Sequence, residues 1–472
     1  MKSGLPGRFR SDSVNRSPSK AARVALVHLG CARNLIDSEL ILARMAERDL
    51  VITDDPTEAH TVVLNTCSFI GPAREESEAA LGELLALKEA GQVQAVVVAG
   101  CLVQRYQRDL ATRFPAVDLF AEISDYCALA DSIRSLVDGG SVDGYIPGQT
   151  QSGEQREGAR LLATPASYAY LRISHGCDHT CAFCAIPSIR GLHRSKRPSA
   201  VLEEARELIA AGTRELVLVA EDSTAWGREI GKDLADLVEA LAELDGEHRL
   251  RIMYAYPNRF PWRLTELLRE HPRVIPYLDI PIQHVATPVL RAMGRSGSGE
   301  TVRRTLDRLR EEVPGITLRT TFLMGFPGES DADAAQAMEF VSTAGLSRLG
   351  AFIYSPEQDT PAWDLPERVP APVAQARYDA LMKVRDDVLL EAQRAELGVP
   401  RRVLVDEVRP AVGQHPPLAL ARGDSDAPEV DMISTIELPT EHGISVGQRP
   451  LVTPRDLDAE GNLTCVLTEG DR

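Results

Sequence analysis

The 472-residue sequence lacks the features that mark membrane-spanning, secreted and disulfide-stabilised proteins. It has no apolar run of about 18 residues or more, so we expect no transmembrane helix. The opening stretch, MKSGLPGRFRSDSVNRSPSK, is polar and basic and has no apolar signal-peptide core. We therefore expect residues 1–22 to form a disordered tail and the protein to be cytoplasmic. Eight cysteines are too few for a disulfide scaffold, which leaves them as reduced thiols for metal binding or catalysis.

The chain is also short of positive charge. Lysine and arginine number 52 against 69 aspartates and glutamates, which gives a formal net charge of -17. Proteins that bind polyanions usually carry a basic surface, because phosphate neutralisation supplies much of their affinity. The composition therefore disfavours a nucleic-acid partner and favours a basic one.

Three apolar segments in the first part of the chain each end in a cysteine. Residues 22–31, 61–67 and 93–101 read as buried strands that alternate with helical patterns and end at Cys31, Cys67 and Cys101. Open parallel α/β sheets bind their ligands at the carboxyl ends of the strands. A buried structural cysteine would explain any one of these positions. Three at equivalent strand ends favour one shared site.

A second triad occupies the segment LRISHGCDHTCAFCAIPSIRG, residues 171–191. The spacing of Cys177, Cys181 and Cys184 suits a [4Fe–4S] cluster held by three thiolates, with one iron left open to a small molecule. Zinc is the alternative, although it would need a distant fourth ligand or a water. A structural metal knuckle is also conceivable. The remaining Cys127 and Cys465 are expected to be packed thiols.

The pattern of elements predicts an α/β multidomain protein. Residues 23–138 form the N-terminal α/β domain, and the Gly-, Ser- and Gln-rich residues 139–162 read as a linker. Residues 163–396 alternate strands and helices in about six βα units, as in an open or closed barrel whose strand ends carry the active face. Short apolar runs between glycines and prolines in residues 397–472 predict a small all-β barrel.

The CxxxCxxC motif after the first barrel strand resembles that of the radical S-adenosylmethionine (SAM) enzymes, which implies a (βα)6 partial barrel. In that family the cluster binds the methionyl group of SAM, and one electron releases a 5′-deoxyadenosyl radical. The resemblance implies that side chains and close-approach glycines at later strand ends contact SAM. The matching positions are Glu221, Asp222, Gln283, Gly325 and Gly328.

Residues 24–468 as a whole resemble the methylthiotransferases, which join a three-cysteine domain, a radical SAM barrel and a C-terminal OB-like barrel of the TRAM type. The resemblance implies a second [4Fe–4S] cluster on Cys31, Cys67 and Cys101 that carries the sulfur to be inserted. It also implies an electron donor such as flavodoxin or ferredoxin, and a sulfur donor. Deletion of residues 397–472 is then expected to weaken substrate capture and to spare SAM cleavage.

Several segments resemble the ribosomal-protein branch of these enzymes: VHLGCARNLIDSELI, YLDIPIQHVATPVLRAMGR, FLMGFPGE and LARGDSDAPEVD. That branch modifies the β-carbon of an aspartate in small-subunit ribosomal protein twelve and gives 3-methylthioaspartate. The same chemistry on a tRNA adenosine derivative is the alternative, but the acidic charge favours the basic protein and no tRNA. An iron–sulfur scaffold protein is a third reading. It is disfavoured because a structural cluster would recruit a fourth cysteine.

Overall fold

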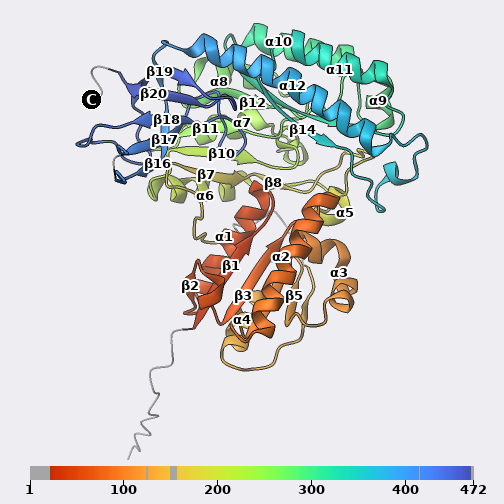
Figure 1. Cartoon of the computed structure of the whole chain (residues 1–472), viewed down its shortest axis with the longest axis vertical. Coiled ribbons are helices and arrows are strands. Elements are labelled where there is room, and N and C mark those ends of the chain that lie inside the picture. The colour runs from red at the N-terminus through yellow and green to blue at the C-terminus, as the bar shows by residue number, and fades with distance from the viewer. Residues whose placement is uncertain (1–21, 124–125, 149–156, 414, 469–472) are drawn as a thin grey trace, which may run out of the picture.

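The computed structural model describes residues 22–123, 126–148, 157–413 and 415–468, so nearly all of the expected tail lies outside it. In these ranges the chain forms three six-stranded sheets, as Figure 1 shows. The predicted α/β multidomain architecture is confirmed. No helix within the described ranges combines the length and apolarity that crossing a membrane requires.

The N-terminal sheet is parallel, with strand order β2-β1-β3-β4-β5-β6. Its strands are β1 (Arg23–His28), β2 (Val51–Thr53), β3 (Thr61–Thr66), β4 (Ala95–Gly100), β5 (Leu119–Ala121) and β6 (Tyr145–Ile146). Its helices are α1 (Ala32–Ala46), α2 (Gly71–Glu89), α3 (Cys101–Arg113) and α4 (Cys127–Val137). β3 and β4 each have an apolar centre and are buried throughout, as expected for central parallel strands. The expected linker contains β6, which pairs with β5, so the sheet continues past residue 138.

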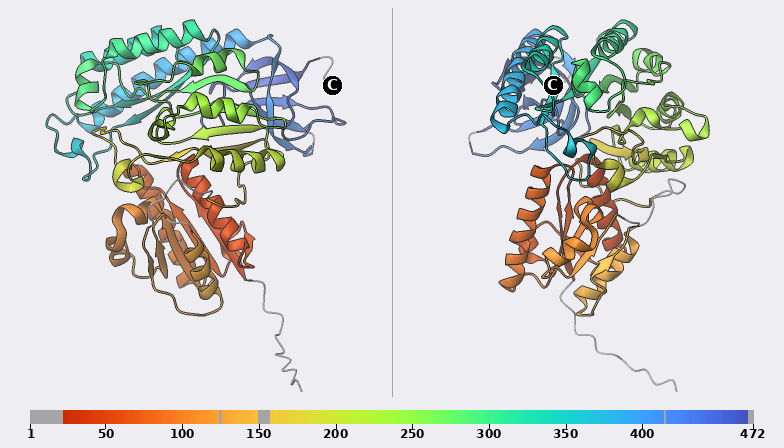
Figure 2. Two further views of the ribbon diagram at one scale, coloured as in Figure 1. Left: turned by 180° about the vertical axis from the view of Figure 1, so that it is seen from behind. Right: turned by 90° about the vertical axis from the view of Figure 1, so that its right-hand side faces the viewer.

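The middle of the chain builds a parallel sheet of order β14-β13-β12-β11-β10-β7. Its strands are β7 (Tyr168–Arg172), β10 (Glu215–Val219), β11 (Arg249–Ile252), β12 (Val274–Asp279), β13 (Thr317–Met324) and β14 (Arg348–Ile353). Its main helices are α6 (Pro198–Ala210), α7 (Leu234–Ala242), α8 (Leu264–Glu270), α10 (Gly299–Glu312), α11 (Asp331–Thr343) and α12 (Ala371–Glu396). Shorter elements are β8 (Ser174–His175), α5 (Ile186–Arg190), β9 (Arg194–Ser195) and α9 (Thr287–Ala292). The helices lie outside the curved sheet (Figure 2), and β7 and β14 remain its edges, so the predicted partial barrel is confirmed.

The C-terminal sheet is a curled half-barrel of order β15-β19-β20-β18-β17-β16, in which only β18 and β20 pair in parallel. Its strands are β15 (Arg401–Arg402), β16 (Leu404–Arg409), β17 (Leu418–Arg422), β18 (Ser434–Glu437), β19 (Leu451–Leu457) and β20 (Leu463–Leu467). Cys465 lies in β20 and is fully buried in the core of this sheet. The predicted all-β C-terminal domain is therefore confirmed.

The connection between β17 and β18 enters the barrel and closes one of its ends. We call residues 424–431 the acidic insert. Within it, Asp424 pairs with Arg249 at the start of β11, and Asp426 pairs with Arg348 at the start of β14. Further along, Asp431 accepts a hydrogen bond of 2.6 Å from the hydroxyl of Tyr277. The insert thus occupies the amino-terminal end of the strands.

This arrangement links the barrel to residues 397–472, whose deletion is expected to weaken substrate capture and spare SAM cleavage; that expectation stays a prediction. Arg348 and Arg251 are almost fully buried. Arg348 pairs with Asp426, and Arg251 donates to the backbone carbonyl of Asp424. A deletion would remove the carboxylate partner of Arg348, whereas Arg251 would keep its ion pair with Glu215. Loss of a partner from a buried ion pair is destabilising.

A single substitution in the insert measures this dependence. Asp426→Asn leaves Arg348 buried without its carboxylate, and we expect a loss of about 3 kcal/mol in the free energy of unfolding. Denaturant titration followed by circular dichroism measures the change. Asp386→Asn is the control. The carboxylate of Asp386 pairs with Arg385 but is half exposed, so this substitution should change the free energy of unfolding by less than about 0.5 kcal/mol. Equal midpoints for the two variants would show that the insert does not stabilise the barrel.

Candidate functional site

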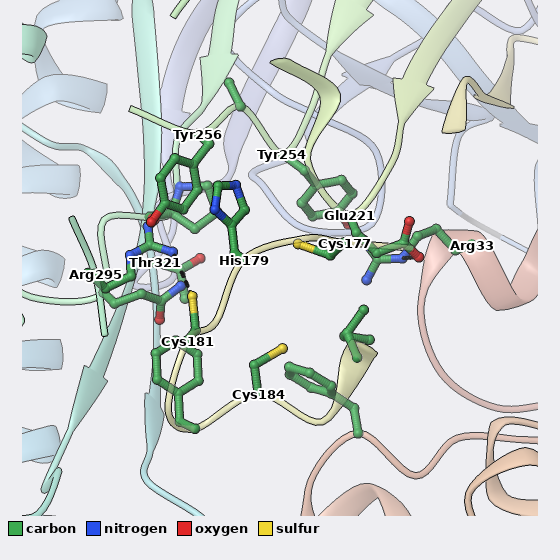
Figure 3. Close-up of a pocket in the computed structure, with 16 residues that line it drawn as sticks. Arg33, Cys177, His179, Cys181, Cys184, Glu221, Tyr254, Tyr256, Arg295 and Thr321 are labelled. Atoms are coloured by element: carbon green, nitrogen blue, oxygen red, sulfur yellow. Dashed lines mark hydrogen bonds and ion pairs between the residues drawn. The ribbon is translucent and has the colours of Figure 1, made fainter. Parts of the chain in front are cut away.

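The cysteine loop of the barrel lines a pocket at the carboxyl end of the strands. Cys177, Cys181 and Cys184 follow β7 and all face this pocket, as Figure 3 shows. Backbone hydrogen bonds fix the loop: the amide of Cys177 donates to the carbonyl of Gly191 at 3.1 Å, and that of Cys184 to Cys181 at 3.1 Å. The three thiols are therefore presented together on one ordered loop.

The electrostatics of this triad fit a metal cluster. Burial raises the pKa of Cys177 and of Cys184 to about 12, so both would be protonated thiols without a cation beside them. Metal binding requires thiolates and supplies the positive charge that stabilises them. Three cysteines on one loop match the ligand set of a [4Fe–4S] cluster with one open iron.

Two predicted SAM-contacting residues line the same pocket. Glu221 follows β10, and its Oε2 is buried without a hydrogen-bond partner among the described residues. Gln283 follows β12 and has a φ of 70°. Tyr254, which also lines the pocket, has a φ of 60°. Left-handed backbone at two non-glycine residues costs energy and concentrates at functional sites.

The other three predicted SAM contacts lie outside the pocket lining. Asp222 is 2.8 Å from Nε2 of His179 and also accepts from the amide of Thr224. Its carboxylate therefore orients His179, which lines the pocket and stacks on Tyr256 with ring centroids 3.8 Å apart.

The two glycines serve the turn after β13 instead. The amide of Gly325 donates to Glu329 at 2.8 Å, and the amide of Gly328 donates to the carbonyl of Glu367 at 3.0 Å. Both amides are thus used within the protein, and the approach of these glycines to the nucleoside stays a prediction.

The sequence reasoning did not identify several residues that line the pocket. They are Arg33, Phe69, His179, Tyr254, Tyr256 and Arg295. His179 lies within the cysteine motif, which is a local signal. Arg33 and Phe69 each follow an N-terminal cysteine by two residues, so nothing in the sequence ties them to the barrel pocket.

The second triad lies on neighbouring strands of the N-terminal sheet. Cys31, Cys67 and Cys101 follow β1, β3 and β4, which are adjacent in the sheet order. Gly30 has a φ of 110°, and a Cβ there would lie only 2.9 Å from the Cβ of Cys67. Glycine is therefore required for the loop to pass beside Cys67. The three cysteines thus lie at one edge of the sheet, at the ends of adjacent strands.

The pKa values of these three thiols differ with their surroundings. Burial raises the pKa of Cys67 to about 11 and also raises that of Cys101. Burial acts in the same direction on Cys31, but the guanidinium groups of Arg33 and Arg190 and nearby backbone amides outweigh it and lower its pKa. A thiol donor set of this kind fits a metal cluster better than an acid–base role.

An interface, called the seam below, joins the N-terminal sheet to the cysteine loop of the barrel. Arg190, at the end of α5, donates to Sγ of Cys101 at 3.3 Å and pairs with Asp37 of α1 at 2.7 Å. Asp37 also pairs with Arg172 of β7 at 2.7 Å. Ile189 packs with Cys101 in a small apolar cluster. The barrel loop therefore touches the N-terminal triad directly.

Part of the expected linker belongs to the seam. Arg160 pairs with Glu39 of α1 at 2.5 Å and with Glu204 of α6 at 2.6 Å. Glu157 pairs with Lys196 at 2.9 Å, and all these groups are largely buried. Residues 149–156 of the same stretch lie outside the described residues. Paired buried charges are costly to separate, so they hold the two parts in register.

Comparison with known proteins places the chain in a family. Residues 171–341 match the radical SAM superfamily, and residues 23–122 match the uncharacterized protein family UPF0004. The protein named ribosomal protein uS12 methylthiotransferase RimO from Geobacter sulfurreducens is 38% identical over 412 residues, which cover 87% of this chain and 91% of that protein. The chain belongs to the RimO family of radical SAM methylthiotransferases. A RimO protein from an Anaeromyxobacter species is 40% identical over 416 residues, covering 88% and 87% of the two chains.

Structural comparison supports the fold of this RimO-family chain. The radical SAM methyltransferase TsrM from Kitasatospora setae, solved with cobalamin and a [4Fe–4S] cluster, aligns with a TM-score of 0.51 and 15% identity. The alignment covers 84% of this chain and 82% of TsrM. Members of the radical SAM superfamily use SAM and a [4Fe–4S] cluster as cofactors. The three thiols of the cysteine loop are the ligands that fit this cluster.

Proposed function

We propose that this RimO-family enzyme methylthiolates the β-carbon of an aspartate in ribosomal protein uS12 and uses two [4Fe–4S] clusters. The relatives at 38% and 40% identity carry the name of that activity. The residue pattern of the ribosomal-protein branch and the net charge of -17, which suits a basic protein substrate, support the same assignment.

The observation that carries the proposal is the packing of the segment after the barrel cysteine loop against the N-terminal triad across the seam. Arg190 follows the barrel cysteine loop and donates to Cys101 of the other triad. Arg33 follows Cys31 and lines the barrel pocket. A radical centre and a sulfur source must lie beside the same substrate carbon, and this seam brings both thiol sets to one place.

The residues divide the work as follows. Cys177, Cys181 and Cys184 would hold the barrel cluster, whose chemistry would be the one-electron cleavage of SAM. The unpartnered Oε2 of Glu221 is suited to accept a hydrogen bond from the methionyl ammonium group of SAM. The apolar side chains of Phe69 and Phe183 line the pocket and exclude water from the radical. Cys31, Cys67 and Cys101 would hold the second cluster, which would supply the sulfur.

In the overall reaction a C–S bond replaces a C–H bond of the substrate. The hydrogen leaves as part of 5′-deoxyadenosine, and a methyl group from SAM completes the methylthio group. The reductive step requires an electron donor such as flavodoxin or ferredoxin, and renewal of the sulfur requires a sulfur donor. We place the enzyme in the cytoplasm, where ribosomal proteins are found, and propose no tRNA substrate.

Mass spectrometry of the target tests the proposed function. Purified uS12 from cells that express the enzyme should be heavier by one sulfur atom and one methylene group than uS12 from cells without it. Fragmentation should place the increase on one aspartate. Total tRNA nucleosides from the same cells are the control and should be identical. An unmodified uS12 together with a methylthio-adenosine difference would replace the protein substrate by tRNA.

A further inference from the structure

Arg33 is a cation that the N-terminal part of the chain contributes to the barrel pocket. It belongs to the first turn of α1, two residues after Cys31, and its side chain crosses the seam. Nη1 donates to the carbonyl of Ala220 at 2.7 Å, and the guanidinium lies 4.9 Å from the ring centroid of Tyr254. These contacts fix the side chain at the pocket wall (Figure 3).

The position of Arg33 relates it to both triads. By sequence it is tied to Cys31, and by its side chain it shares the pocket lining with Cys177 and Cys184. A substrate carbon that receives a radical from one triad and a sulfur from the other must lie between them. A group fixed at this boundary is therefore placed to hold the substrate.

Arg33 keeps hydrogen-bonding capacity for a ligand. A guanidinium has five N–H donors, and the carbonyl of Ala220 takes one. Its Nε is 3.6 Å from Oε1 of Glu221, which is an ion pair but too long for a hydrogen bond. The side chain is 17% exposed, so its free donors are open to the pocket. A planar guanidinium with free donors suits a carboxylate.

Arg295, the other arginine that lines the pocket, contacts the cysteine loop. Nη1 of Arg295 lies 3.7 Å from Sγ of Cys181, and Nη2 donates to the carbonyl of Pro281. Its guanidinium also covers the ring of Tyr256 at 4.3 Å. Arg295 thus supports the loop that carries the barrel triad, which leaves Arg33 as the better placed carboxylate receptor.

We propose that Arg33 binds the side-chain carboxylate of the substrate aspartate and so holds its β-carbon between the two cysteine triads. The inference rests on the proposed function, because it assumes an aspartate substrate. The carboxylate carbon is bonded directly to the β-carbon, so a fork of two hydrogen bonds from Arg33 fixes the reacting atom within one bond of its anchor.

A double-mutant cycle on binding, without turnover, tests this contact. The dissociation constant of uS12 and of uS12 with the target aspartate changed to asparagine is measured on the reconstituted enzyme with SAM and no reductant. In the unmodified enzyme the asparagine protein should bind roughly 100-fold more weakly, because a charged pair is lost. In Arg33→Gln the two proteins should bind equally, and Arg33→Lys should keep an intermediate preference.

Control variants and outcomes separate this inference from the proposed function. Arg48→Gln removes an arginine that pairs with Asp131 on the outer side of the N-terminal part, and it should keep the full preference. If Arg33→Gln or Arg33→Lys retains the preference of the unmodified enzyme, Arg33 is not the anchor. The Lys variant decides the question even where the Gln variant does not fold. An unmodified enzyme that fails to bind or modify uS12 rejects the proposed function instead.

Discussion

Cys177→Ala is expected to abolish formation of 5′-deoxyadenosine. The three thiols of the barrel loop line one pocket, and loss of one removes a third of the protein ligands of the cluster that cleaves SAM. With the cluster lost or disordered, SAM has neither its iron anchor nor its electron. The measurement is 5′-deoxyadenosine by liquid chromatography after anaerobic reconstitution with dithionite as reductant.

Cys127→Ala is the matched control for this substitution. Cys127 begins α4 and belongs to neither triad, so its loss should leave SAM cleavage unchanged. Cys181→Ala and Cys184→Ala should behave like Cys177→Ala. Retention of full activity in any of these three variants would exclude the barrel loop as the site of SAM cleavage.

Cys67→Ala is expected to separate the two halves of the reaction. Bond scission in SAM depends on the barrel triad, so 5′-deoxyadenosine should still form. Methylthiolated uS12 should be absent, because the sulfur is presented by the N-terminal triad. Cys67 is the best choice of the three, since Arg190 contacts Cys101 and Arg33 follows Cys31, so its loss leaves these cross-seam contacts intact.

Iron analysis is the control for this second result. Two clusters correspond to about eight irons per chain, and replacing all three N-terminal cysteines should leave about four. The same samples are assayed for 5′-deoxyadenosine and for the mass of uS12. Normal product from Cys67→Ala, or unchanged iron in the triple variant, would mean that the N-terminal triad is structural and carries no sulfur.

The cysteine positions could be predicted because local patterns determine them. The apolar centres of strands such as β3 and β4 are visible in the sequence, and parallel sheets bring the carboxyl ends of their strands to one edge. The alternation of strands and helices therefore predicts the shared edge, whereas the order of β1, β3 and β4 is seen only in the structure. The spacing of the barrel cysteines is likewise a property of one short loop.

The seam could not be predicted, because its contacts join residues far apart in the chain. Glu157 and Arg160 occur in a stretch whose Gly, Ser and Gln content indicates a loop, yet both pair with buried charges. No periodicity marks an ion pair across such distances. Tyr254 and Gln283 adopt left-handed backbone without being glycine, so their turns leave no sequence signal either. Conversely, Gly325 and Gly328 have positive φ values that the turn after β13 accounts for, and their contact with SAM stays a prediction.

The acidic insert sets a condition for exchanging domains between relatives. Its carboxylates are paired with arginines that begin the barrel strands, among them Arg249 and Arg348. A C-terminal half-barrel grafted from another protein would have to bring matching acids at positions 424 and 426, or the recipient barrel would have to lose those arginines. The unit that can be transplanted is thus the half-barrel together with the first residues of the strands it closes. A boundary drawn at residue 397 cuts through that unit.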